Sequence, residues 1–106
     1  MRPELIDFVS TPSRLDADAA LSLIRAAAAR KPSFRLWTSS RLLKRLGVPW
    51  HLPEHKRLLH RVDHVLRELE SRGALVRRPQ KQTTRITRDA WAWRNEWAYE
   101  LAGPPA

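Results

Sequence analysis

The feature that most constrains this chain is one amphipathic segment between Pro53 and Gly73. Its apolar residues fall within an arc of about 120° when the segment is drawn as a helix. They are Leu58, Leu59, Val62, Val65, Leu66 and Leu69. The opposite side carries Lys56, Arg57, His60, His64 and Arg67. Proline suits a first helical turn and glycine a helix end, so the segment predicts a helix with one core face. Its cationic face is either a binding surface or an ordinary solvated surface.

The charge of the chain is strongly positive and unevenly distributed. Twenty Lys and Arg residues stand against 11 Asp and Glu residues, and the pI is about 11.4. This value exceeds the pI of about 9 that marks basic nucleic-acid-binding domains. Residues 30–94 hold 17 of the basic residues and five of the acidic ones, a net charge of +12. The distribution predicts a polyanionic partner.

Several classes of protein are disfavoured. The absence of cysteine excludes disulfides, thiolate metal sites and cysteine nucleophiles. The longest apolar run, residues 26–29, is too short for a membrane span or a signal-peptide core. With three glycines there is no glycine-rich phosphate loop, and no nucleophile motif is present. We therefore expect no enzyme, no cofactor, no metal and no membrane partner, and a cytoplasmic location, nucleoid-associated in a prokaryote.

A first helix is predicted after an N-terminal arm of residues 1–12. Ser13 as N-cap, with Asp16 three residues later, approximates a capping box at the start of this helix. Alanine, leucine and isoleucine then recur on one helical face. Pro32 ends the helix, because the residue before a proline disfavours the helical conformation.

A short strand and a second helix are predicted next. Residues 34–38 (FRLWT) have aromatic ends and the length of a single strand. Ser39 or Ser40 is the expected N-cap of the helix RLLKRL, and Gly47 and Pro49 end it. A polar and proline-containing connection then leads to the amphipathic segment.

The C-terminal third predicts a hairpin followed by an element of ambiguous type. Residues 74–79 (ALVRRP) and 83–87 (TTRIT) are expected to be strands joined by a turn at residues 80–82 (QKQ). In residues 90–101 a period of two aligns the tryptophans on one face, whereas a period of 3.6 produces a broad apolar side. A preceding Thr or Asp as N-cap and a following glycine favour the helix, and a strand is the alternative.

This order of elements resembles the winged-helix DNA-binding domains. The expected order α-β-α-α-β-β-α spans residues 13–101. The segment HRVDHVLRELESRGALVRR is similar to the end of the family's recognition helix and its first wing strand, and RITRDAW resembles the exit from the wing. The resemblance implies a winged helix-turn-helix, mainly α with a small β-hairpin, as one domain at 13–103, with an arm at 1–12 and a tail at 104–106.

The resemblance also implies where DNA is contacted. Residues 54–72 would be the recognition helix and residues 77–86 the basic wing, since such domains contact base edges and phosphates with these two parts. The recognition helix would present His55, Lys56, Arg57, His60, Arg61 and His64. The wing would present Arg77, Arg78, Lys81 and Arg85. The preceding helix would place Arg41, Lys44 and Arg45 near the DNA backbone.

The implied partner is double-stranded DNA, bound by a transcriptional regulator or a small chromosomal architectural protein. The recognition face carries no Asn or Gln, the residues best suited to adenine, so charge and shape are expected to dominate binding. Two other functions stay open, an RNA-binding or ribosome-associated protein and a winged helix used as a protein-interaction module. The scarcity of Asn, Gln and Met is typical of thermophiles, although a GC-rich genome is an equal explanation.

Two groups of residues have competing interpretations. Four histidines form two His-x3-His pairs, His51 with His55 and His60 with His64. They lack a third ligand, so nucleic-acid contact or plain exposure is favoured over a metal site. Three tryptophans fall in the C-terminal element: Trp91, Trp93 and Trp97. They are expected in the core, with base stacking or a homodimer through terminal helices as alternatives.

Overall fold

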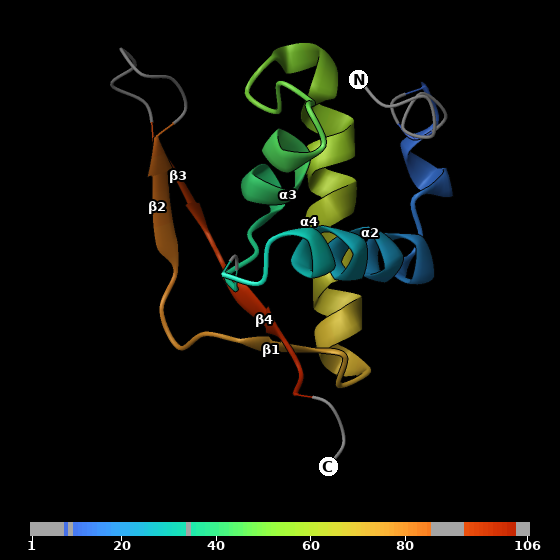
Figure 1. Cartoon of the computed structure of the whole chain (residues 1–106). Coiled ribbons are helices and arrows are strands. Elements are labelled where there is room, and N and C mark those ends of the chain that lie inside the picture. Colours follow the sequence, from blue (N-terminus) through green and yellow to red (C-terminus); the bar gives the residue numbers. More distant parts are fainter. Residues whose placement is uncertain (1–7, 9, 34, 86–92, 104–106) are drawn as a thin grey trace.

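The computed structural model describes residues 8, 10–33, 35–85 and 93–103, without the side chains of residues 84, 85 and 93. Its elements in chain order are η2 (Pro12–Arg14), α2 (Ala17–Arg30), α3 (Ser39–Arg45), η3 (Pro53–His55), α4 (Lys56–Ser71), β1 (Leu75–Arg77), β2 (Gln82–Arg85), β3 (Trp93–Glu96) and β4 (Tyr99–Leu101), where η marks a 3-10 helix. In Figure 1, α2 crosses in front of α4, and the strands form a ribbon along one side of the helices.

Helix α4 is the centre of the fold. It packs against α2, α3 and β1. Every apolar residue assigned by the sequence to its inner face is buried: Leu58, Leu59, Val62, Val65, Leu66 and Leu69. Ile24 of α2 and Leu42 of α3 meet this face, and both are fully buried. Burial of one such side chain contributes about 1.5–3 kcal/mol, so the predicted core face of α4 is confirmed and holds the three helices together.

The helix starts lie close to the predicted positions but use different caps. Asp16, rather than Ser13, caps α2, because its carboxylate accepts a hydrogen bond from the backbone N–H three residues later at 2.8 Å. Thr38 caps α3 in the same way, with a distance of 3.1 Å. Ser39 and Ser40, the expected caps, lie inside the helix, where their hydroxyl groups donate to carboxylates of other elements.

The strands form one antiparallel ribbon in two stretches. The register runs from Leu75↔Leu101 to Arg77↔Tyr99 in the first stretch and from Gln82↔Glu96 to Arg85↔Trp93 in the second. Trp37 adds a single bridge to β4, because it exchanges two backbone hydrogen bonds with Tyr99, at 2.7 and 2.8 Å. The short strand expected at residues 34–38 is thus reduced to this one bridge, and β4 lies between it and β1.

The C-terminal segment corrects two predictions. The helix expected over residues 90–101 is wrong, since residues 93–96 and 99–101 are strands, as the period of two indicated. Ala and Glu favour a helix locally, but pairing with β1 and β2 and the burial of Tyr99 override that propensity. The turn expected at residues 80–82 is also wrong, because the strands on either side of it pair with β4 and β3 instead.

These corrections change the expected wing and dimer. The hairpin expected within residues 77–86 is only the outgoing arm of a longer ribbon, and its return arm begins at β3. A homodimer through terminal helices loses the C-terminal helix that it needed.

Trp91, with the rest of residues 86–92, lies outside the described residues. Within the described ranges, no helix is both long and apolar enough to cross a membrane.

Candidate nucleic-acid interface

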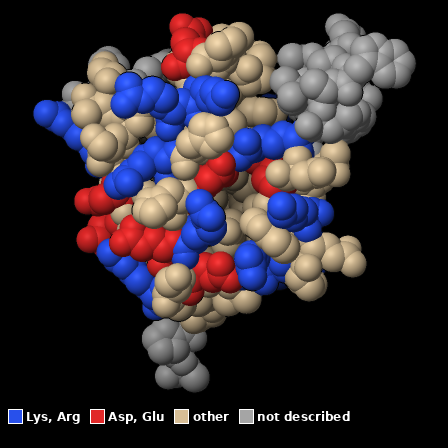
Figure 2. All heavy atoms as spheres, turned by 180° about the vertical axis from the view of Figure 1, so that it is seen from behind, with Lys and Arg blue, Asp and Glu red and all other residues tan. Residues whose placement is uncertain are grey.

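The outer face of α4 carries a row of exposed basic and ionisable side chains. They are Lys56, Arg57, His60, His64 and Arg67. Because the inner face of α4 packs on α2 and α3, this row points away from the helical core. Lys56, Arg57 and Arg67 form no ion pair with any acid of the described residues. Figure 2 views the molecule from this side, and blue basic groups cover much of it with acidic groups between them.

The acidic residues of α4 are each engaged by an arginine. Glu68 accepts a hydrogen bond from Arg72 at 2.9 Å, one helical turn later. Glu70 Oε2 lies 3.3 Å from Arg77 Nε of β1. Asp63 is engaged by an arginine of β3. Since these carboxylates are paired, the unpaired cations determine the net field of the outer face.

One arginine of the ribbon joins β3 to α4. Arg94 Nη2 contacts both carboxylate oxygens of Asp63, at 2.6 and 2.7 Å. Its Nε donates to Glu96 Oε1 at 2.9 Å. The side chains of Arg94 and Asp63 are 21% and 28% exposed, whereas that of Glu96 is 1% exposed. This guanidinium therefore sits between one carboxylate on α4 and one on its own strand.

The same cluster reaches the first turn of α3. Ser39 Oγ donates to Asp63 Oδ1 at 2.5 Å. Glu96 accepts from the backbone N–H of Ser40 at 3.0 Å and from the Ser40 hydroxyl group. Burial alone would raise the pKa of Glu96, but the hydrogen bonds from Ser40 and Arg94 outweigh it and hold this pKa below its ordinary value. We call Ser39, Ser40, Asp63, Arg94 and Glu96 the anchor cluster. It fixes the ribbon relative to both α3 and α4.

A polar cleft of about 310 Å³ lies between α4 and the ribbon. Its lining residues are Ser39, Asp63, Arg67, Lys81, Arg94, Asn95, Glu96, Trp97 and Tyr99. The two carboxylates at the cleft belong to the anchor cluster. The exposed side chains of Arg67 and Lys81 are the cations of this lining that have no ion pair among the described residues. The cleft thus connects a cation of α4 with a cation of the ribbon.

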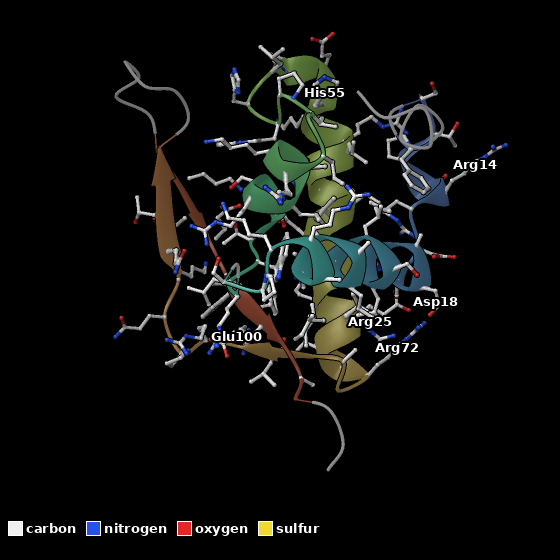
Figure 3. All side chains as sticks on the ribbon, in the orientation of Figure 1. Arg14, Asp18, Arg25, His55, Arg72 and Glu100 are labelled. Carbon is white, nitrogen blue, oxygen red and sulfur yellow. The ribbon has the colours of Figure 1, made fainter. Side chains whose placement is uncertain are left out.

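The residues expected on the recognition helix fall into two groups. Lys56, Arg57, His60 and His64 are exposed, as expected. The placement of His55 is wrong, because its side chain is only 8% exposed. It lies seven residues before Val62, which is two helical turns, and so shares the core face at the N-terminal end of α4 (Figure 3). Arg61 is half-buried, and its Nε donates to the Leu15 carbonyl at 2.8 Å.

The wing residues differ in how far they are free to contact a partner. Arg77 lies over the Trp97 ring, 4.3 Å from its centroid, and Lys81 Nζ lies 5.2 Å from the same ring. Arg78 forms an exposed ion pair of 3.0 Å with a glutamate of β4. Arg85 belongs to β2, and its side chain lies outside the described set. Lys81 is exposed and is the described wing cation that lines the cleft.

The residues expected to approach the DNA backbone lie on α3. Lys44 and Arg45 are exposed at its C-terminal end. Arg41 is half-buried, and its Nη1 donates to the Leu36 carbonyl at 3.2 Å, so it also secures the chain before the helix. Across the described ranges, no three histidine or carboxylate side chains come together as a metal site.

The anchor cluster is the part of this surface that sequence reasoning missed. Arg94 and Glu96 are two residues apart, so they share one face of a strand, and this signal disappears when the segment is treated as a helix. Asp63 lies about one turn after His60 and one turn before Arg67, among the basic residues of the outer face of α4, which is a second signal for a structural partner. Ser39 and Ser40 were considered only as caps.

Comparison of the chain with protein families, with curated proteins and with solved structures finds no significant match. The functional conclusion therefore depends on the geometry and charge of this chain alone.

Proposed function

We propose that this chain is a winged-helix protein that binds duplex DNA, with α4 as its recognition helix and the ribbon of β1–β4 as its wing. The arrangement of the strands supports the proposal. Trp37 precedes the first helix of the α3–α4 pair and bridges to β4, and β4 pairs with β1 after α4. A winged helix needs this connection, because it places the ribbon beside the recognition helix.

The observation that carries the proposal is the pair of cationic elements joined by the anchor cluster. Lys56, Arg57 and Arg67 line the outer face of α4, and Lys81 stands across the cleft from Arg67. Phosphate contacts supply much of the affinity of a protein for DNA. When they come from two rigid elements, they also fix the register and orientation of the protein on the duplex. Arg94 holds the two elements in one geometry through Asp63, so the surface is formed before DNA binds.

The chemistry of the outer face favours charge and shape over base sequence. α4 contains no Asn or Gln, and its exposed side chains are Lys, Arg and His. Arg57, near the N-terminal end of α4, is the residue best placed to contact guanine. Modest sequence preference suits a small chromosomal architectural protein, or a transcriptional regulator that gains specificity from a second factor.

Competition binding with the intact protein tests this function. A labelled duplex is bound at about 50 mM salt and displaced with unlabelled duplex, single-stranded DNA or an RNA hairpin. We expect the duplex to compete best. An RNA hairpin that competes better would move the function to RNA, and the absence of duplex binding at this salt concentration would contradict the proposal.

A further inference from the structure

A second basic surface lies on α2 and the connection that follows it. Residues 19–53 contain seven Lys and Arg residues and no Asp or Glu, so this third of the chain has no internal counter-charge. Four of these residues lie on α2 and the connection before α3, are exposed and form no ion pair with a described acid: Arg25, Arg30, Lys31 and Arg35. We call these four the second basic surface.

This surface faces away from the outer face of α4. The inner face of α2, with Ala20, Ile24 and Ala27, is buried against α4. Its outer row has small exposed side chains, Ser22, Ala26 and Ala29, and the two arginines of α2 flank them. In Figure 1, α2 lies on the near side of the molecule and α4 on the far side. Arg25 and Arg30 of α2 and the cationic row of α4 therefore lie on opposite sides of the helical core.

The acid of α2 that lies on the same side as Arg25 is paired with an arginine of α4's C-terminal end. Asp18 lies two helical turns before Arg25 and so projects from a similar side of the helix. Its carboxylate is 3.2 Å from Arg72 Nη1 at the end of α4, and Figure 3 shows the two residues next to each other. The charge of Arg25 is thus available for an external anion.

We propose that the second basic surface binds a second DNA duplex, so that one molecule bridges two duplexes. The inference rests on the proposed function, because the outer face of α4 binds the first duplex. Charge complementarity identifies the occupant, since four cations that form no ion pair with a described acid match the regularly spaced phosphates of a duplex backbone. Small side chains between the arginines let the backbone approach the helix closely.

The separation of the two surfaces makes simultaneous binding feasible. The shortest principal extent of the chain is 25 Å. This length exceeds the Debye length of about 10 Å at 0.1 M salt, so repulsion between two duplexes on opposite sides is largely screened. Four phosphate contacts predict a slope of about −3.6 for log K of the second surface against log salt. Bridging needs both surfaces, so it should fall with salt more steeply than binding of the first duplex alone.

A capture experiment tests bridging with the intact protein. Beads carry one biotinylated duplex, and the captured amount of a second, labelled duplex is measured at about 50 mM salt. The second-surface variant combines Arg25→Gln, Arg30→Gln, Lys31→Gln and Arg35→Gln. The control variant removes the same number of charges from the other surface by Lys56→Gln, Arg57→Gln, Arg67→Gln and Lys81→Gln. Affinity for a single free duplex is measured in parallel by anisotropy.

The wild type should capture the second duplex, and the second-surface variant should lose about nine-tenths of that capture while its affinity for a single duplex stays within about twofold. The control variant should lose capture and most of its affinity for a single duplex, keeping only the weaker binding of the second basic surface. Undiminished capture by the second-surface variant would overturn the proposal, as would a loss of its affinity for a single duplex. A wild type that binds one duplex but captures no second one would overturn bridging alone. A wild type that binds no duplex would overturn the proposed function as well.

Discussion

Arg94 of β3 contacts both carboxylate oxygens of Asp63 of α4 through a single nitrogen, Nη2, at 2.6 and 2.7 Å. The two residues are 31 positions apart in sequence, and the contact ties the ribbon to the central helix. The same guanidinium engages the buried Glu96 at 2.9 Å. The geometry of the proposed DNA-binding surface therefore depends on one arginine that itself need not contact DNA.

Replacement of Arg94 should lower the stability of the fold. Arg94→Met leaves Glu96 buried without its cation and releases Asp63, so we expect the free energy of unfolding to fall by about 2–4 kcal/mol. The matched control is Arg78→Met, which breaks an exposed ion pair of the same ribbon, 3.0 Å from Glu100, and should cost less than about 1 kcal/mol. Urea unfolding of both variants measures the difference. Equal losses would show that the anchor cluster has no special role.

Acid should weaken the fold through Glu96. The pKa of Glu96 in the folded protein lies below its ordinary value of 4.5, so the unfolded chain binds the proton more readily. The stability that this carboxylate provides is complete well above pH 4.5 and is lost as the pH falls through the lower, folded value.

The variant Glu96→Gln should be less stable than the wild type at neutral pH and should show a shallower loss of stability between about pH 5 and pH 3. Urea midpoints over this range provide the measurement. Glu100→Gln removes an exposed carboxyl group from the same ribbon and serves as the control. Parallel pH profiles for the wild type and Glu96→Gln would contradict the assigned role of this carboxylate.

The sequence predicts that His55 contacts DNA, whereas the structure buries its side chain. It is buried, and its Nδ1 has no hydrogen-bond partner among the described residues. His55→Leu should therefore leave the affinity for a duplex within about twofold and leave the stability unchanged or slightly higher, since an unpaired buried polar atom is removed. Anisotropy and urea unfolding test this, with the neighbouring exposed Lys56→Gln as the comparison. A large loss of affinity in His55→Leu would place this side chain in the interface after all.

Gly73 ends α4 in a left-handed conformation, with φ of +81°. A Cβ at this position meets no atom within 4 Å, so Gly73→Ala adds backbone strain without a steric clash. We expect it to cost about 1–2 kcal/mol, which lowers Tm by about 4–8 °C per kcal/mol in a domain of this size. Gly103→Ala, at a glycine that also has open space but no positive φ, should be close to neutral in the same thermal scan.

The sequence predicted the helical part of the fold because its signals are local. The period of 3.6 in α4 identifies both the core row and the exposed cations. The same period, followed two turns back from Val62, leads to His55, and the assignment of His55 to the DNA-contacting face overlooked this. The caps were missed by one to three residues, since several polar residues adjoin each helix start and local sequence does not rank them.

The ribbon could not be predicted in the same way, because its pairing is not local. Residues 90–101 carry good helix formers, and only the distant partner strands β1 and β2 convert the segment into β3 and β4. The anchor cluster depends on that pairing, since Arg94 reaches Asp63 only from a strand. The cationic outer face of α4 was visible in the sequence, whereas the geometry that joins it to Lys81 was not.

The salt dependence of duplex binding tests the central claim most directly. If the outer face of α4 and the ribbon contact about five to seven phosphates, log K should fall with log salt at a slope of roughly −5 to −6. Arg57→Gln should reduce the magnitude of this slope by about 1, whereas Arg14→Gln, which removes an exposed charge outside both surfaces, should not change it. Equal slopes for the two variants would show that net charge alone, rather than this surface, determines binding.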